Sequence, residues 1–278
     1  MQSQPLGMYA WFGYRLPLEQ RLKLIAQAGF STTCLWFGED EELFAAKTAD
    51  KMPPLARETG LSVDNIHAPF EECNGLWSDS RMAVAAALDP YFRALEYCRK
   101  HDIPILVVHV GKGSSPPPPT QTGLQALEGL VARAEKLGVV LAIENTRSPH
   151  HADFVLSGIQ SDHLGLCYDS SHDFISGHSP CELLRKWGDR LLTTHLSDNN
   201  GRNDDHYLPG DGCIDWELVR DAFPGDRYSG SIMLEVVPQN FEHIPAEQFV
   251  CTAFKRASEM REKLGQQSFG GNEDRQST

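Results

Sequence analysis

Imidazole and carboxylate side chains recur at the ends of the short apolar runs in this 278-residue chain, or a few residues beyond them. The residues at these places are Asn65, His67, His109, Glu144, Asn145, Asp169, His172, His195, Asp204, Asp205, His206 and Glu235. Zinc, manganese, cobalt and iron bind imidazole nitrogens together with carboxylate oxygens, whereas calcium and magnesium prefer oxygen ligands. Burying several carboxylates together without a cation is unfavourable. The sequence therefore predicts a divalent metal centre.

Eight apolar runs alternate with helical patterns and must position these side chains. The predicted strands are Gly7–Phe12, Phe30–Phe37, Leu61–His67, Ile105–Val110, Val139–Glu144, Leu164–Asp169, Leu191–Leu196 and Ser231–Val236. Strands that alternate with helices favour a parallel sheet, and eight of them favour a closed barrel whose strand ends share one rim. We predict an α/β fold, a single (β/α)8 TIM barrel over residues 1–264. A doubly wound open sheet is the alternative, and it would need a glycine-rich phosphate turn, which the chain lacks.

The intervening segments predict eight helices. They are Pro17–Ala28, Glu42–Thr59, Arg81–His101, Gln121–Leu137, Ala152–Ser157, Cys181–Trp187, Trp216–Phe223 and Ala246–Leu264. Pro90 lies inside the third helix and predicts a kink or a break there. Residues 265–278 are polar and glycine-rich, which predicts a flexible tail.

Charge and composition narrow the class of protein. The formal net charge of −13 disfavours nucleic acid as a partner. The chain has no run of about 18 apolar residues, so no membrane span is expected, and the N-terminal residues lack the pattern of a secretory signal. Seven cysteines without a CxxC pair favour reduced, buried thiols and a cytoplasmic protein.

The most specific stretch of the chain is residues 194–216, THLSDNNGRNDDHYLPGDGCIDW. This stretch is similar to a pattern in bacterial sugar phosphate isomerases and epimerases. With its strand-end residues, nearly the whole chain resembles the xylose isomerase-like TIM barrel superfamily, which also contains endonuclease IV.

The resemblance implies two sets of metal ligands. In the isomerases and epimerases one ion is held by four groups, which match Glu144, Asp169, His195 and Glu235. In the endonuclease IV-like members a three-zinc cluster uses five further ligands, which match His67, His109, His172, Asp204 and His206. We therefore expect one to three ions of zinc, manganese, cobalt or iron.

The resemblance also implies a reaction. We expect a metal-dependent isomerase or epimerase of a sugar, sugar phosphate or related polyol or keto acid, in which Glu144 and Glu235 move a carbon-bound proton through an enediolate. His172, Arg202 and Trp36 are the expected substrate-binding residues. The expected partner is a small carbohydrate, without a membrane, and a homo-oligomer is compatible with the sequence.

Two alternatives remain at this point. An endonuclease IV-like metal-dependent phosphodiesterase acting on abasic DNA would use the full ligand set, but the acidic chain carries few cations after its first three strands, Arg15 and Arg81 being the nearest. A metal-bound sugar sensor or scaffold would need no acid–base pair, although Glu144 and Glu235 offer one.

Overall fold

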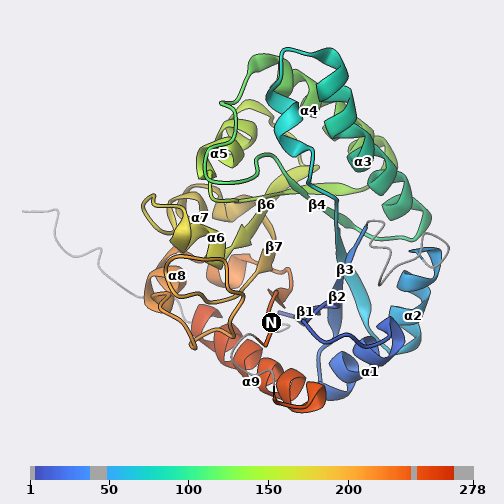
Figure 1. Cartoon of the computed structure of the whole chain (residues 1–278), viewed down its shortest axis with the longest axis vertical. Helices are drawn as coiled ribbons and strands as arrows, with labels where there is room; N and C mark the ends of the chain where they lie inside the picture. The colour runs from blue at the N-terminus through green and yellow to red at the C-terminus, as the bar shows by residue number, and fades with distance from the viewer. Residues whose placement is uncertain (1–3, 38–48, 239–242, 266–278) are drawn as a thin grey trace, which may run out of the picture.

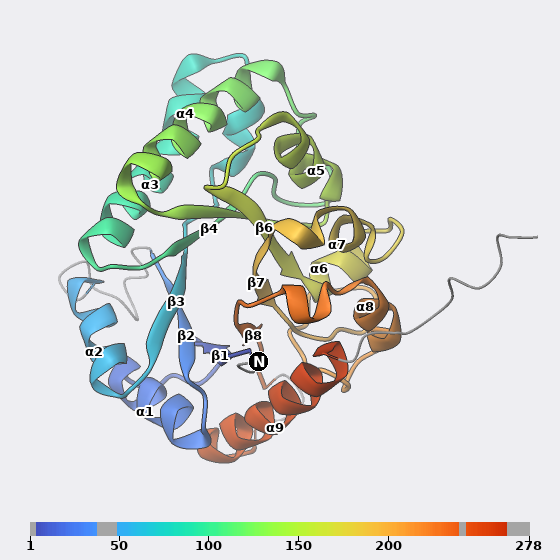
Figure 2. The same ribbon diagram turned by 180° about the vertical axis from the view of Figure 1, so that it is seen from behind.

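The structure is a computed structural model that describes residues 4–37, 49–238 and 243–265 (Figure 1). Its strands lie in the middle and its long helices at the periphery (Figures 1 and 2). The strands are β1 (Leu6–Tyr9), β2 (Thr32–Trp36), β3 (Ser62–His67), β4 (Ile105–His109), β5 (Val140–Glu144), β6 (Leu164–Asp169), β7 (Leu191–His195) and β8 (Ile232–Leu234). They form one sheet in the order β7-β6-β5-β4-β3-β2-β1-β8, and each of the paired neighbours is parallel.

The two ends of this sheet meet just after β7. Leu196 forms a parallel bridge with Leu234. The Leu196 N–H donates to the Met233 carbonyl at 2.8 Å, and the Glu235 N–H donates to the Leu196 carbonyl at 3.2 Å. These bonds bring β8 against the chain that leaves β7, which confirms the predicted (β/α)8 barrel.

Helices follow the strands, as predicted. They are α1 (Leu18–Ala28), α2 (Met52–Glu58), α3 (Arg81–Lys100), α4 (Gln121–Leu137), α5 (Pro149–Gly158), α6 (Ser170–Ile175), α7 (Glu182–Trp187), α8 (Trp216–Ala222) and α9 (Ala246–Gly265). Short 3-10 turns are η1 (Ala49–Lys51), η2 (Cys73–Trp77), η3 (Gly188–Arg190) and η4 (Gly225–Arg227). Residues 42–48 of the predicted Glu42–Thr59 helix and residues 266–278 of the predicted tail lie outside the described residues.

Helix α4 shows why its bounds could be read from the sequence. The Thr120 hydroxyl precedes the first turn and accepts the Gly123 N–H at 3.1 Å. The helix ends at Gly138, whose φ of 69° is left-handed and therefore suits glycine.

Of the kink or break predicted at Pro90, the break is wrong, because α3 runs through this residue without interruption. Proline removes one main-chain hydrogen bond from a helix. Leu88, Tyr91 and Ala94 are buried on both sides of it, and the Tyr91 hydroxyl donates to the His109 carbonyl at 2.6 Å. Packing of α3 against the barrel outweighs the lost bond.

Successive side chains along a strand point alternately toward the surrounding helices and into the barrel. This alternation directs strand-end residues such as Glu144 into the barrel. In β5, Leu141 and Ile143 belong to the main core, which includes apolar residues of the helices. Ala142 instead clusters with Val107 and Cys167 inside the barrel. Glu144 follows Ala142 by two residues and therefore faces the barrel interior at the carboxyl end of the strand.

All seven cysteines lie in the described ranges and are free thiols, with Cys213 and Cys251 exposed and the others buried. Among residues 4–37, 49–238 and 243–265, no helix has the length and apolar character that crossing a membrane requires.

Candidate metal centre

Glu144 lies at the centre of a group of imidazoles at the barrel mouth. Its side chain is 1% exposed. Its Oε2 lies 3.1 Å from His67 Nε2, 3.2 Å from His109 Nε2 and 3.2 Å from His195 Nδ1. Its Oε1 lies 3.2 Å from His172 Nδ1. One buried carboxylate therefore contacts four histidines from four different segments of the chain.

Four strand ends form an inner set of possible ligands. One ligand atom from each of Glu144, Asp169, His195 and Glu235 lies within 4.8 Å of the others. The register of β6 and β7 pairs Asp169 with His195. Glu235 follows β8, and its Oε2 lies 3.0 Å from His195 Nδ1. The barrel thus brings acids that are far apart in the sequence to one point.

The remaining five predicted ligands adjoin this inner set. His67 and His109 form a second compact group with Glu144, again with ligand atoms within 4.8 Å. Asp204 Oδ2 lies 3.0 Å from His172 Nε2 and 3.2 Å from His206 Nε2. The nine predicted ligands therefore form one connected cluster. Asp205, between two of them, instead accepts the Asn200 N–H at 3.0 Å.

Several buried polar atoms of the cluster make no hydrogen bond and are placed where they could bind a cation. His109 Nε2, His172 Nδ1 and His195 Nδ1 lie near Glu144 oxygens without hydrogen-bond geometry, and Asp169 Oδ2 is likewise buried without a hydrogen bond among the described residues. Buried polar atoms in proteins are normally paired. A divalent ion would take up these lone pairs, and the mixture of nitrogen and oxygen fits zinc, manganese, cobalt or iron.

Two of the histidines are oriented by main-chain carbonyls. His67 Nδ1 lies 2.8 Å from the Ala68 carbonyl, and His206 Nδ1 lies 3.1 Å from the Glu235 carbonyl. An N–H donated to each carbonyl leaves Nε2 as the lone-pair nitrogen that faces the cluster. Such outer contacts fix the tautomer and orientation of metal-binding histidines.

Burial and neighbouring charges together lower the pKa of Glu144 and raise the pKa of Asp169. Burial acts to raise the pKa of Glu144, but attraction to His109 and His195 holds this pKa well below its ordinary value. Burial dominates at Asp169 and raises its pKa to about 7, despite attraction to His172. A cation beside Asp169 would favour the ionised carboxylate.

Zinc affinity of the metal-free protein is expected to rise with pH. Burial opposes protonation of His206, but its bond to Asp204 and attraction to Glu235 raise its pKa from 6.5 to about 9. This pairing therefore stabilises the metal-free fold fully below pH 6.5, and the stabilisation is lost as the pH rises through 9. Zinc must displace the proton, so each proton released adds about tenfold in affinity per pH unit. Calorimetric zinc titrations between these pH values, in buffers of different ionisation enthalpy, would count the protons, and a pH-independent affinity would disprove this expectation.

Aromatic rings cover the outer histidines. Trp36 stacks on His67 with ring centroids 5.0 Å apart, and Phe70 stacks on His109 at 4.2 Å. Trp36 is half-buried at the end of β2. Arg202, a predicted substrate-binding residue, lies exposed in the segment after β7, outside the buried cluster.

Sequence reasoning missed one residue beside the cluster and one in the segment after β7. One ligand atom from each of Cys167, Glu144 and His195 lies within 4.8 Å of the others. Cys167 precedes Asp169 by two residues on β6, so strand alternation was the signal that could have found it. Asp198 belongs to the distinctive stretch after β7, but nothing in the residue types alone indicated its contacts.

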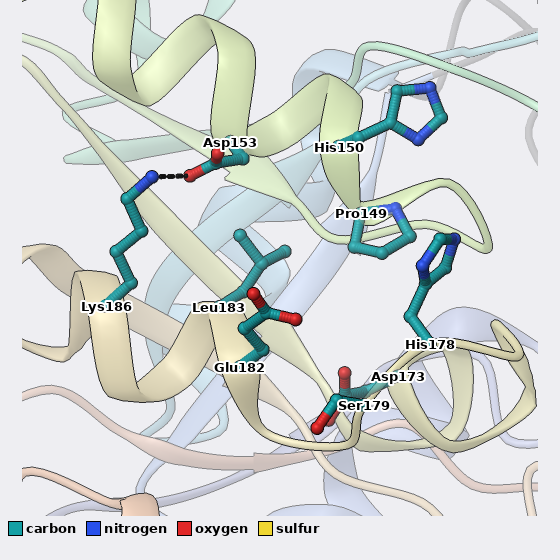
Figure 3. A pocket seen from close by; sticks show the side chains of 9 residues that line it. All are labelled: Pro149, His150, Asp153, Asp173, His178, Ser179, Glu182, Leu183 and Lys186. Carbon is teal, nitrogen blue, oxygen red and sulfur yellow. Dashed lines mark ion pairs between the residues drawn. The ribbon is translucent and has the colours of Figure 1, made fainter.

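Figure 3 shows a separate pocket that is lined by residues of α5, α6 and α7 and of the segment before α7. The volume of this pocket is about 210 Å³. His150 and His178 line it, and Lys186 and Asp153 form an ion pair at 2.6 Å on its wall. None of the nine predicted ligands lines this pocket.

Known proteins resemble the chain over a part or most of its length. A family model described as xylose isomerase-like TIM barrel matches residues 22–260. The protein y4fM of Sinorhizobium fredii is 38% identical over 96 residues, which cover 34% of this chain but only 28% of y4fM. Fructoselysine 3-epimerase of Escherichia coli O157:H7 is 24% identical over 257 residues, covering 83% of this chain and 90% of that enzyme.

Solved structures share the fold. The crystal structure of a D-tagatose 3-epimerase-like protein superposes with a TM-score of 0.72 and 20% identity, covering 94% of this chain and 99% of that one. At this identity the likeness shows a common barrel.

Proposed function

The chain belongs to the xylose isomerase-like TIM barrel family, and from this premise we propose that it is a metal-dependent isomerase or epimerase of a sugar, sugar phosphate or related polyol or keto acid. One observation carries the proposal: ligand atoms of Glu144, Asp169, His195 and Glu235 lie within 4.8 Å of one another at the carboxyl ends of the strands. In TIM barrels this end of the strands carries the chemistry. Similarity to fructoselysine 3-epimerase over most of both chains supports the reaction class.

The two glutamates are the proposed acid–base pair. Glu144, Asp169, His195 and Glu235 would hold the divalent cation, which would supply Lewis-acid polarisation of a substrate carbonyl. Glu235 is 22% exposed and Glu144 only 1%, so Glu235 is the more accessible to a substrate carbon. Burial opposes ionisation of Glu235, but attraction to His195 holds its pKa well below the ordinary value. Glu235 is therefore ionised at neutral pH in the metal-free protein, and its role as the base rests on its accessible position. Transfer of a proton from the carbon beside the carbonyl to Glu235 would generate an enediolate.

The mouth of the barrel offers contacts for a sugar. His172 is 14% exposed and lies between Glu144 and Asp204, where it can contact a substrate hydroxyl. Trp36 provides an apolar ring for the C–H face of a sugar. Arg202 is exposed on the neighbouring segment and would have to turn toward the mouth to contact a substrate oxygen or phosphate.

A panel of keto- and aldo-sugars and their phosphates in deuterated water tests the reaction class. Protein saturated with zinc or manganese is expected to place solvent deuterium on the carbon beside the carbonyl of at least one sugar and to form its isomer or epimer. Nuclear magnetic resonance measures both. A chelator should abolish the exchange and added metal should restore it. Metal-saturated protein that exchanges no carbon-bound proton in any of these sugars would overturn the proposal.

A second candidate, an endonuclease IV-like phosphodiesterase, is favoured by the group formed by His172, Asp204 and His206, which adds ligands beyond those of a single metal site. The net charge of −13 opposes binding to DNA. Incubation of the metal-saturated protein with an oligonucleotide that contains one abasic site decides between the two. We expect the strand to stay intact, and cleavage at that site would favour the phosphodiesterase.

A further inference from the structure

The carboxylate of Asp198 is the organising contact of the long segment after β7. Asp198 is fully buried. Its Oδ1 accepts the N–H groups of Asn199 at 2.9 Å and Ile214 at 3.0 Å. Its Oδ2 accepts the Gly210 N–H and the Trp216 indole N–H, both at 2.9 Å. This side chain therefore ties four positions of the segment together.

The rest of the segment fits closely around this carboxylate. A Cβ added to Gly212 would lie 2.3 Å from Asp198 Oδ1 and 2.3 Å from the Asn199 carbonyl, so only glycine fits there. The Cys213 N–H donates to the Asn199 carbonyl at 2.8 Å. Asp198 and Tyr207 exchange two main-chain hydrogen bonds of 2.9 and 2.8 Å.

The same contacts fix the backbone that carries the outer ligands. His206 immediately precedes Tyr207 and has a φ of 52°, a left-handed conformation that residues other than glycine rarely adopt. The Val237 N–H donates to the His206 carbonyl at 2.9 Å. Held between Tyr207 and Val237, His206 lies beside Asp204, which in turn contacts His172.

We propose that Asp198 is a positioning residue that holds Asp204 and His206 against His172 and so completes the outer part of the metal centre. This inference rests on the metal dependence in the proposed function. The four hydrogen bonds of the Asp198 side chain go to residues that are not among the nine ligands. Asp198 therefore acts on the ligands indirectly, by fixing the backbone of the segment that carries them.

Zinc titration of the metal-free Asp198→Asn protein tests the inference. The amide keeps the shape of the carboxylate but places an NH2 group opposite N–H donors, so part of the network is lost. Substitution of outer contacts weakens metal binding by about 10- to 100-fold. The outer zinc is the ion that an Asp204→Asn protein no longer binds. We expect Asp198→Asn to weaken binding of this ion by that factor, and to change the affinity for the ion at the inner set by less than about threefold.

Asp215→Ala, which removes a helix cap, is the control. Asp215 lies in the same segment, is exposed, and caps α8 by accepting the N–H groups of Glu217 at 3.0 Å and Leu218 at 3.4 Å. This variant is expected to lower the thermal midpoint without weakening the outer zinc. A purely structural role of Asp198 would make both variants behave alike.

The outcomes of the titration distinguish failure of the Asp198 inference from failure of the proposed function. Unchanged outer zinc in Asp198→Asn, or a wild-type protein that binds only the inner equivalent, would overturn the inference and leave the proposed function standing. A wild-type protein that binds no zinc would overturn both. If Asp198→Asn does not fold, Trp216→Phe removes one of the four donors and keeps a ring, and it should weaken the outer zinc in the same direction by a smaller factor. Unweakened outer zinc in Trp216→Phe would then count against the inference.

Discussion

A Glu235→Gln protein is expected to keep its metal and to lose turnover by about 10²- to 10⁴-fold or more, the range of a general acid–base group. The amide preserves length and retains an oxygen for the cation, and three inner ligands remain. It removes the proton acceptor. Turnover of the sugar identified in the panel and incorporation of solvent deuterium should fall in parallel.

The measurement needs proof of metal content in the same sample. Glu128→Gln, an exposed glutamate on α4, is the matched control and should keep wild-type turnover. Wild-type turnover in a Glu235→Gln protein of verified metal content would remove Glu235 from the acid–base pair.

A Glu144→Gln protein is expected to lose metal as well as turnover. Glu144 belongs to both compact ligand groups, and its two oxygens contact four imidazoles. The amide halves the number of acceptor oxygens and removes the charge that offsets the cation. Substitution of residues that only hydrogen-bond to a metal ligand already lowers metal affinity by about 10- to 100-fold. Glu144 is itself a proposed ligand, so we expect its substitution to lower metal affinity by more than about 100-fold.

Zinc titrations of the two glutamine variants side by side separate the roles of the glutamates. Retention of zinc in Glu235→Gln and its loss in Glu144→Gln is the expected pair of results. Near wild-type zinc affinity in Glu144→Gln would show that this carboxylate is not the central ligand.

The sequence predicted the barrel because each strand is a short apolar run with its own helix. The prediction for β6 matches Leu164–Asp169 in the structure. Helix α6 was missed because it is only six residues long and starts directly from the strand end, where the Asp169 carboxylate accepts the His172 N–H at 2.6 Å. The break expected at Pro90 failed because tertiary packing, which a local pattern does not contain, holds α3 together.

The candidate ligands could be listed from the sequence because most of them follow a predicted strand directly or by a few residues, and the family resemblance implied how they divide into two sets. The role of Asp198 could not, since its partners are main-chain N–H groups and an indole up to 18 positions away, brought together only by the folded segment. Arg202 was placed beside the substrate by its charge and position in the chain, and the structure leaves it exposed.

The metal content of the purified protein after saturation with zinc and dialysis is the most direct test of the metal centre. Elemental analysis is expected to give at least one zinc per chain, with further equivalents if the outer ligands are occupied. Glu144→Gln should retain less than the wild type. A folded wild-type protein that holds no divalent metal under these conditions would contradict the account.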